Sequence, residues 1–277
     1  MNFKDIVSRL EKICPESSEY EARILFESCA EQSIPPHLAH SDFTIDDEEL
    51  CAKLELYIKR REAHEPLQYI VGEWDFYRQK YFVSRDCLIP RSDTEVLVEH
   101  AIRLLPQNAR FADLCTGSGC IAVSTLCERP DTTAVMVEKF PSTMDVAIAN
   151  AIRNGVQDRG ESILMDLLTD EERLAGREFD AILSNPPYIR PEVIEALSEE
   201  VKFEPYAALY GGEDGLVFYR KIIETYSKFV KKGGFMLLEI GYDQADDLKN
   251  IAQEHGYYCE IFKDYGGNDR VAYITGF

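Results

Sequence analysis

The chain has little positive charge for its length. Thirty Lys and Arg residues stand against 50 Asp and Glu residues, which gives a formal net charge of −20 over 277 residues. Unaided binding to nucleic acid relies on Lys and Arg displacing counterions from phosphates, so this balance argues against it. The acidic excess is consistent with a basic protein partner or simply with solubility.

Long apolar runs and paired cysteines are also lacking. No stretch approaches the roughly 18 apolar residues of a membrane span, and the N-terminal MNFKDIVSRL is charged where a signal peptide needs an apolar segment. The eight cysteines contain no C-x-x-C pair, and the five histidines offer one close pair, His37 and His40, with no third ligand nearby. We therefore expect a reduced, cytoplasmic protein without a metal site, whose cysteines are mostly small core residues.

The spacing of apolar residues divides the chain into two parts. Up to about residue 70 the spacing is helical, as at Leu50, Leu54 and Ile58, and the proline-containing SIPPHLAHSD (33–42) predicts a loop between helices. The alternating GEWDFYRQKYFVS predicts a β-hairpin. We therefore expect a helical domain at residues 1–70, a hairpin linker at 71–87 and a second domain at 88–277.

From about residue 90 short apolar strands alternate with helical stretches. The predicted strands are RFADLC, TAVMVE, SILMD, FDAILS, GFMLLEI, YYCEIF and RVAYIT. Such alternation is typical of a parallel, doubly wound sheet. The last two strands are separated only by KDYGGND, which is too short for a helical crossover, so they should pair antiparallel. The prediction is an α/β, Rossmann-like domain with a seven-stranded, mostly parallel sheet and an antiparallel last strand.

A glycine-rich stretch, DLCTGSGCIA (113–122), follows the first of these strands and opens a helix. Gly117 and Gly119 permit a sharp turn and the close approach of a ligand. Glu138 ends the next strand, where a carboxylate can accept hydrogen bonds from ribose hydroxyls. The pattern favours an adenosine-containing cofactor, although dinucleotide-binding folds share it and a tight turn with an incidental acid is the structural alternative.

Asp113 favours S-adenosyl-L-methionine over NAD as that cofactor. A carboxylate just ahead of the glycines would repel a pyrophosphate, which prefers an open helix N-terminus, but can help hold a methionine ammonium group. The antiparallel last strand also fits a methyltransferase sheet better than a dehydrogenase sheet. An NAD-dependent oxidoreductase is therefore the less favoured reading.

The motif SNPPYIR, residues 184–190, comes directly after the fourth strand. Its two prolines stop the strand, its asparagine carries both a donor and an acceptor, and its tyrosine offers an aromatic face. These features suit a planar NH₂ group, whose nitrogen is a poor nucleophile. Acceptors placed for its transition state lower the barrier without a general base. The predicted catalytic residues are Asn185, Pro186, Pro187 and Tyr188; a stiff loop without chemistry is the alternative.

Several longer motifs resemble the HemK/PrmC family of release factor glutamine methyltransferases. They are EPLQYIVGEWDFY (65–77), LIPRSDTEVLVEH (88–100), NPPYI (185–189), EPYAALYGGEDGLVFYRKI (204–222), LLEIG (237–241) and DYGGNDRV (264–271). The resemblance covers nearly the whole chain. It implies a class I S-adenosylmethionine-dependent methyltransferase domain and an N-terminal helical domain that recognises the release factor. The implied reaction methylates the glutamine of the factor's Gly-Gly-Gln motif and leaves S-adenosyl-L-homocysteine.

The resemblance also implies roles for single residues. Leu167 would flank the adenine, Asn185 and the Pro186 carbonyl would accept hydrogen bonds from the glutamine NH₂, and Tyr188 would pack against that amide. The expected cofactor-binding residues are Asp113, Cys115, Thr116, Gly117, Ser118, Gly119, Glu138, Asp166, Leu167 and Asn185. The family pattern usually has proline at Ser92, aspartate at Glu138 and an aromatic residue at Leu167. Pocket and purely structural roles stay open for Arg91, Thr94, Glu95 and Glu239.

Two alternative functions use the same features. An adenine amino-methyltransferase acting on DNA or RNA shares the N-P-P-Y motif, but it needs a basic groove and a way to extrude the base. A non-catalytic S-adenosylmethionine-binding module would not need the amide-holding motif. The resemblance implies class-one peptide chain release factors as partners, and we expect no stable nucleic acid binding and no membrane association.

Overall fold

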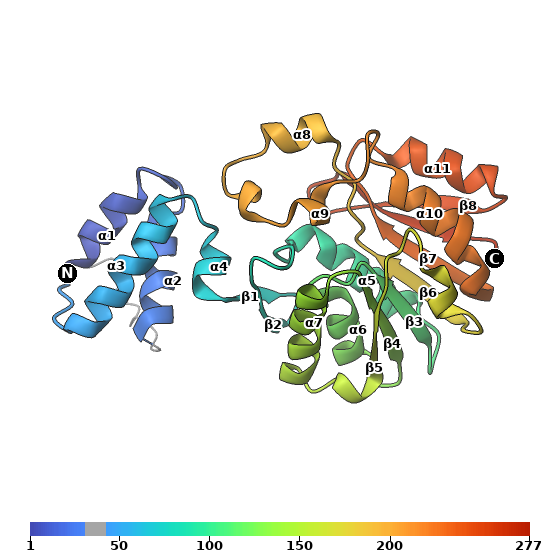
Figure 1. Ribbon diagram of the computed structural model, residues 1–277, viewed down its shortest axis with the longest axis horizontal. Coiled ribbons are helices and arrows are strands. Elements are labelled where there is room, and N and C mark those ends of the chain that lie inside the picture. The colour runs from blue at the N-terminus through green and yellow to red at the C-terminus, as the bar shows by residue number, and fades with distance from the viewer. Residues whose placement is uncertain (31–42) are drawn as a thin grey trace. The chain divides into compact units, whose positions relative to one another are not determined.

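The computed structural model describes residues 1–30 and 43–277, which form two compact units (Figure 1). The first unit comprises Met1–Glu73 together with Ser198–Phe203, and the second comprises Trp74–Leu197 and Glu204–Phe277. The expected loop at residues 33–42, with His37 and His40, lies outside the described residues.

The first unit is helical. Asn2 and Asp47 cap two of its helices, because their side chains accept hydrogen bonds from first-turn N–H groups. Leu54 and Ile58, which the spacing placed on one helix face, are fully buried. The helices are α1 (Phe3–Leu10), α2 (Ser18–Ala30), α3 (Glu48–Glu62) and α4 (Leu67–Val71).

A buried arginine joins the two chain segments of this unit. Arg61 is 2% exposed, and its guanidinium contacts Glu21 in α2 and Glu200 in Ser198–Phe203, each at 2.6 Å. A charge buried this deeply needs partners of opposite sign. The short segment Ser198–Phe203 is therefore held in the helical unit by an ionic contact that apolar spacing does not reveal.

The second unit contains a seven-stranded sheet in the order β5-β4-β3-β6-β7-β9-β8. Neighbours from β5 to β7 pair in parallel, while β9 is antiparallel to both β7 and β8. The predicted strands and the closing antiparallel pair are confirmed. The strands are β3 (Arg110–Leu114), β4 (Thr133–Glu138), β5 (Gly160–Leu164), β6 (Phe179–Ser184), β7 (Val230–Glu239), β8 (Tyr258–Lys263) and β9 (Asp269–Thr275).

The position of β9 inside the sheet was not predicted. Because a hairpin can join a sheet through either of its strands, loop length alone does not say which one becomes the edge. Here β9 pairs with β7, and β8 forms the edge. The other predicted hairpin forms a separate two-stranded sheet from β1 (Glu73–Phe76) and β2 (Gln79–Phe82).

Helices cover both faces of the large sheet (Figure 1). One core contains Phe111 and Leu183 from the strands and lies under α5 (Glu95–Leu104), α6 (Cys120–Glu128) and α7 (Pro141–Arg153). The other contains Leu114 and Ile182 and lies under α10 (Val217–Thr225) and α11 (Ala245–Glu254). Burial on both faces explains the apolar runs of the central strands, such as residues 134–137 of β4 and 235–238 of β7. Two short helices, α8 (Pro191–Ala196) and α9 (Tyr206–Leu209), follow β6.

All eight cysteines are free thiols, and none is classed as exposed. Throughout residues 1–30 and 43–277 no helix has both the length and the apolar content needed to cross a membrane. Within the same ranges no three His, Cys, Asp or Glu side chains gather as a metal site would require.

Candidate active site

A cavity of about 480 Å³ opens at the carboxyl ends of the parallel strands. Residues 115–118 after β3, Glu138 at the end of β4, Leu167 after β5 and Asn185 after β6 all line it. Open α/β sheets bind ligands at this edge, and the volume lies within the range of about 300–1,000 Å³ of small-molecule sites. The sheet order therefore brings the separately predicted motifs to one place.

Two glycines in the loop between β3 and α6 have different functions. Gly117 has φ +56°, and a Cβ built there would meet nothing nearer than a backbone oxygen at 4.0 Å, so it leaves open space at the cavity wall. Gly119 has φ +80°, and its Cβ would lie 3.2 Å from the Cβ of Ala147 in α7. Gly117 thus leaves room for a ligand, and Gly119 allows α6 to pack closely on α7.

Asp113 supports this loop through hydrogen bonds and does not line the cavity. Its Oδ2 accepts hydrogen bonds from the Thr116 hydroxyl at 2.5 Å and from the Ala122 N–H at 3.2 Å. Burial raises the pKa of Asp113 to about 7, against the lowering effect of these hydrogen bonds. Its Oδ1 has no hydrogen-bond partner in the described part of the chain. The carboxyl group therefore fixes the loop and keeps one unused acceptor.

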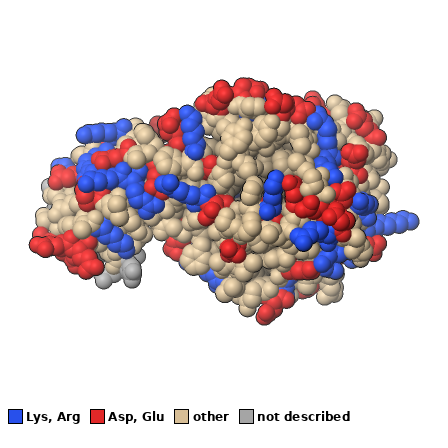
Figure 2. All heavy atoms as spheres, in the orientation of Figure 1, with Lys and Arg blue, Asp and Glu red and all other residues tan. Residues whose placement is uncertain are grey.

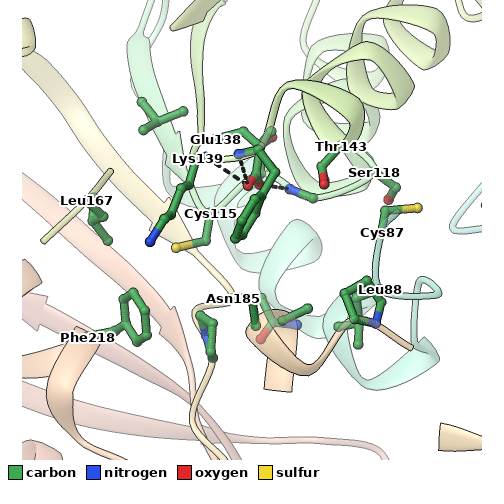
Figure 3. A pocket seen from close by; sticks show the side chains of 18 of the residues that line it. Cys87, Leu88, Cys115, Ser118, Glu138, Lys139, Thr143, Leu167, Asn185 and Phe218 are labelled. Atoms are coloured by element: carbon green, nitrogen blue, oxygen red, sulfur yellow. Dashed lines mark hydrogen bonds between the residues drawn. The ribbon is translucent and has the colours of Figure 1, made fainter. Parts of the chain in front are cut away.

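Glu138 lies across the cavity from Asn185 (Figure 3). Its Oε2 accepts a hydrogen bond from the N–H of Gly117 at 3.1 Å, and its Oε1 accepts from the N–H groups of Lys139 at 2.8 Å and Phe140 at 3.1 Å. These bonds hold the carboxylate at the end of β4, while Oε2 retains a second lone pair. A carboxylate fixed in this way can accept a hydrogen bond from a ligand hydroxyl.

One side of the cavity is apolar and ends at an ion pair. Leu167 and Phe218 lie on this side in Figure 3, and the Tyr226 hydroxyl donates to the Leu167 carbonyl at 2.7 Å. Asp166 pairs with Lys139 at 2.8 Å. Burial opposes ionisation of Asp166, but hydrogen bonds from Lys139 and from a backbone N–H outweigh it and lower its pKa. This side is suited to a flat, weakly polar group with a polar edge.

The N-P-P-Y motif leaves β6 at the cavity wall, but only part of it faces the cavity. Asn185 and Pro187 line the cavity; Pro186 is buried, and Tyr188 packs against the core under α10 and α11. The Nδ2 of Asn185 donates to the Thr94 hydroxyl oxygen at 3.3 Å. The amide oxygen, Oδ1, is therefore the atom that remains to accept a hydrogen bond from a ligand.

A second segment supports this motif from outside the sheet. The N–H of Ile189 donates to the Leu209 carbonyl at 2.8 Å, and the N–H of Gly211 donates back to the Ile189 carbonyl at 3.0 Å. A Cβ on Gly215 would lie 2.5 Å from the carbonyl oxygen of Tyr188. The Gly-rich sequence after α9 is therefore required for close backbone contact with the motif.

Several cavity residues were missed by the sequence analysis. They belong to the loop before α5, to the turn after β4 and the first turn of α7, and to the segment around α9: Asp86, Cys87, Leu88, Ile89, Pro90, Phe140, Thr143, Pro205, Ala207, Ala208 and Tyr210. Many lie in the motifs LIPRSDTEVLVEH and EPYAALYGGEDGLVFYRKI, whose prolines and glycines were the available signal.

The structure distinguishes the roles of Arg91, Thr94 and Glu95, which the sequence left open. Arg91 and Thr94 line the cavity, whereas the Glu95 carboxylate accepts a hydrogen bond from the Tyr77 N–H at 2.7 Å and so holds the small hairpin. Arg91 forms an ion pair with Glu204, whose other oxygen accepts from the Ile89 N–H at 3.1 Å. Glu204 thus links the segment before α9 to the loop before α5, and both segments line the cavity.

Comparisons with known proteins agree with this geometry. Residues 3–72 match the family described as the PrmC N-terminal domain, and residues 92–203 match the Methyltransferase small domain. The catalytic domain of hMettl16, solved with a hairpin of the MAT2A 3'UTR, is similar in fold: its TM-score is 0.56 at 16% identity, covering 86% of this chain and 84% of that one.

Sequence relatives extend over most of the chain. The Release factor glutamine methyltransferase of Aquifex aeolicus is 37% identical over 81% of this chain and 79% of its own length, and that of Geobacter sulfurreducens is 41% identical over 83% and 80%. A Bifunctional methyltransferase of Rickettsia felis is 36% identical over 98% of this chain, which spans 57% of that longer relative. The chain belongs to the release factor glutamine methyltransferase family, and its resemblance to HemK/PrmC is confirmed.

Proposed function

We propose that this protein transfers a methyl group from S-adenosyl-L-methionine to the side-chain amide nitrogen of the glutamine in the Gly-Gly-Gln motif of class-one peptide chain release factors. The observation that carries the proposal is that Asn185 lines the same cavity as Glu138 and residues 115–118. An acceptor for an amide and an acceptor for a ribose thus face one space. The relatives named as release factor glutamine methyltransferases support this choice of substrate.

The residues present fit S-adenosyl-L-methionine as the cofactor. Gly117 leaves room beside the loop, Oε2 of Glu138 keeps a lone pair for a ribose hydroxyl, and Leu167 with Phe218 offers apolar contact for an adenine. When bound, the cofactor supplies a methyl group on a positively charged sulfur. Asp113 and Gly119 would act indirectly, the first by fixing the loop and the second by allowing α6 its close packing. The proposed contacts come from Cys115, Thr116, Gly117, Ser118, Glu138, Asp166, Leu167 and Asn185.

The chain's own part in catalysis is to hold an unreactive amide in place. Oδ1 of Asn185 and the carbonyl of Pro186 would accept the two N–H groups of the glutamine, and Pro187 fixes the backbone between them. These acceptors stabilise the nitrogen as it becomes tetrahedral and partly positive, and they align it for direct attack. The amide nitrogen would take the methyl group from the sulfur, which would keep the electron pair of the broken sulfur–carbon bond, and the surplus proton of the methylated nitrogen would pass to water. Because Tyr188 lies behind the motif, we assign it to support of Asn185.

The helical unit and the net charge indicate how the protein would recognise its partner. We infer that residues 1–70 recognise the release factor, and that the net charge of −20 favours a basic region of that factor. Acidic side chains form patches on the face shown in Figure 2, and basic side chains lie interspersed between them. A substrate of the translation machinery also implies action in the cytoplasm.

The test is methylation of a purified release factor in the presence of S-adenosyl-L-methionine, followed by mass spectrometry of the peptide that contains Gly-Gly-Gln. We expect one added methyl group on the glutamine, and none with Asn185→Ala. That variant should still bind S-adenosyl-L-homocysteine in calorimetry, because Glu138 and the glycine loop are intact. Parallel reactions with DNA and RNA should incorporate no methyl group. Methyl incorporation into nucleic acid, or none into the release factor, would overturn the proposal.

A further inference from the structure

A buried carboxyl group that the proposed reaction does not use lies behind the cavity wall. Glu239 is the last residue of β7 and is 2% exposed. Its Oε2 atom has no hydrogen-bond partner in the described part of the chain, and Glu239 does not line the cavity. A carboxyl group is seldom buried without full pairing unless the site requires it, so its neighbours are informative.

Thr94 lines the cavity and also interacts with Glu239, which does not line it. It is 2% exposed and occupies the position that begins α5, where a threonine side chain normally accepts a hydrogen bond from the helix backbone. No such capping bond forms here. Instead the hydroxyl oxygen of Thr94 accepts the 3.3 Å hydrogen bond from Nδ2 of Asn185, and the hydroxyl group interacts with the Glu239 carboxyl.

The direction of these bonds follows from counting protons. The Thr94 hydroxyl has one proton, and a carboxyl group always has an oxygen that accepts one. If that proton points to Glu239, the lone pairs of Thr94 face Asn185 and select its NH₂ group. The amide oxygen of Asn185, a residue that lines the cavity, is then the atom that remains to accept a hydrogen bond from a ligand. Without this polarity a threonine hydroxyl can equally donate to the amide oxygen, which would turn the NH₂ group toward the substrate.

Burial and the neighbouring groups set the pKa of the Glu239 carboxyl group, which offers Thr94 an acceptor oxygen. Burial raises the pKa of Glu239 to about 7; the hydrogen bond from Thr94, the positive charge of Arg270 and the Tyr188 hydroxyl lower it, and the negative charge of Asp93 raises it. Arg270 is itself held by Asp264 at 3.1 Å and by Asp93 at 3.2 Å. Since a protonated carboxyl group retains its carbonyl oxygen, Thr94 finds an acceptor in either state.

We propose that Thr94 and Glu239 are positioning residues that fix the amide of Asn185 with its oxygen toward the methyl-accepting nitrogen. Glu239 acts through Thr94, and neither residue touches the reacting atoms. The inference rests on the proposed function for the identity of the group that Asn185 holds. It assigns roles to Thr94, in the loop before α5, and to Glu239, in the motif LLEIG, for which the sequence left pocket and structural roles open.

The first test replaces only the hydroxyl group. Thr94→Val keeps the side-chain shape, and we expect kcat for methylation of the release factor to fall about tenfold or more, with KM for S-adenosyl-L-methionine within about twofold of wild type. Thr94→Ser should retain kcat within about threefold. Thr125→Val is the matched control, because Thr125 is a fully buried threonine in α6 whose hydroxyl donates to the Ile121 carbonyl of the same helix. Unchanged kcat in Thr94→Val, or equal losses in a folded Thr94→Ser, would overturn the inference.

The second test asks whether Glu239 works through Thr94. Glu239→Gln can present either an oxygen or an NH₂ group to Thr94, so it should lower kcat by a few-fold. The double variant Thr94→Val/Glu239→Gln should be no slower than Thr94→Val alone, because the second change then has nothing left to disturb. Multiplied losses would show that Glu239 acts independently and would overturn the proposed link.

A crystal structure of Thr94→Val provides a readout that needs no substrate. We expect the Asn185 side chain to change conformation or to occupy more than one, while Thr125→Val leaves it in place. A single, unmoved Asn185 in the Thr94→Val structure would overturn the inference whatever the enzyme acts on. If wild type fails to methylate the release factor, the proposed function fails, and this structural result still decides the positioning role.

Discussion

Gly211 lies directly against the backbone of Tyr188. A Cβ built on Gly211 would be 2.5 Å from the Cα of Tyr188 and 2.9 Å from the carbonyl oxygen of Pro187. The backbone of Gly211 is not left-handed, so glycine is required here by space and not by conformation. Together with the parallel bridge between Ile189 and Tyr210, this contact fixes the position of the N-P-P-Y motif on the side away from β6.

Gly211→Ala is therefore expected to displace the motif and lower kcat by about tenfold or more, because small displacements of a positioning group are costly to catalysis. Gly160→Ala is the matched control: its Cβ would meet the Met136 side chain at an ordinary 3.4 Å, at the start of β5. Methyl-transfer kinetics and melting temperatures of both variants check this. Equal kcat values for the two variants would contradict the prediction.

Glu138→Gln is expected to weaken binding of S-adenosyl-L-homocysteine by about 10- to 100-fold, the range for losing hydrogen bonds to a charged group. An amide cannot accept at both ends, so either the Gly117 N–H or the N–H groups of Lys139 and Phe140 would face an NH₂ group. Calorimetric titration gives the dissociation constant. Glu161→Gln, a change at an exposed ion pair with Arg177, should leave it unaltered. Wild-type affinity in Glu138→Gln would show that the Glu138 carboxylate does not bind the cofactor.

Asp113 is expected to make the protein less stable as pH rises toward neutrality. Burial raises its folded-state pKa to about 7, so the folded state holds this proton more tightly than the unfolded state does. The contribution is complete below the unfolded pKa, about 3.9, and is lost as pH rises through 7.

Asp113→Asn removes this titration and keeps an oxygen that accepts from Thr116 and Ala122. The titration of Glu239 is the same in both proteins, so it cancels in the difference between them. The free energy of unfolding of wild type minus variant should fall by on the order of 2 kcal/mol between about pH 5 and about pH 8. Denaturant titrations at the two pH values measure this difference. A difference that does not change with pH would contradict the assignment.

Arg61→Ala is expected to destabilise the helical unit by about 3–5 kcal/mol, because it leaves the buried Glu21 without its counter-charge. Arg23→Ala provides a control of the same chemistry on the surface. Arg23 is 40% exposed and pairs with Glu27 at 3.9 Å, so its loss should cost about 1 kcal/mol or less. Equilibrium unfolding of both variants checks the contrast, and similar losses would show that burial does not matter at Arg61.

Much of the fold was predictable because the central strands are largely apolar and many of the turns carry glycine or proline. The meeting of residues 115–118, Glu138 and Asn185 followed from sheet topology alone. Contacts between residues far apart in the chain were not predictable in this way. The place of β9, the support given by Glu204 and the position of Tyr188 behind the cavity wall depend on packing that periodicity does not encode.

The helical unit is built from two separate stretches of chain, so it cannot be cut away at a single point. A protein lacking Met1–Glu73 would still carry Ser198–Phe203, now with no unit to pack into, and Glu200 would lose Arg61. Loss of activity in such a truncated protein would mix missing recognition with a disordered insertion in the catalytic domain. The substrate recognition that we propose for the helices is therefore better probed with surface substitutions in the intact chain.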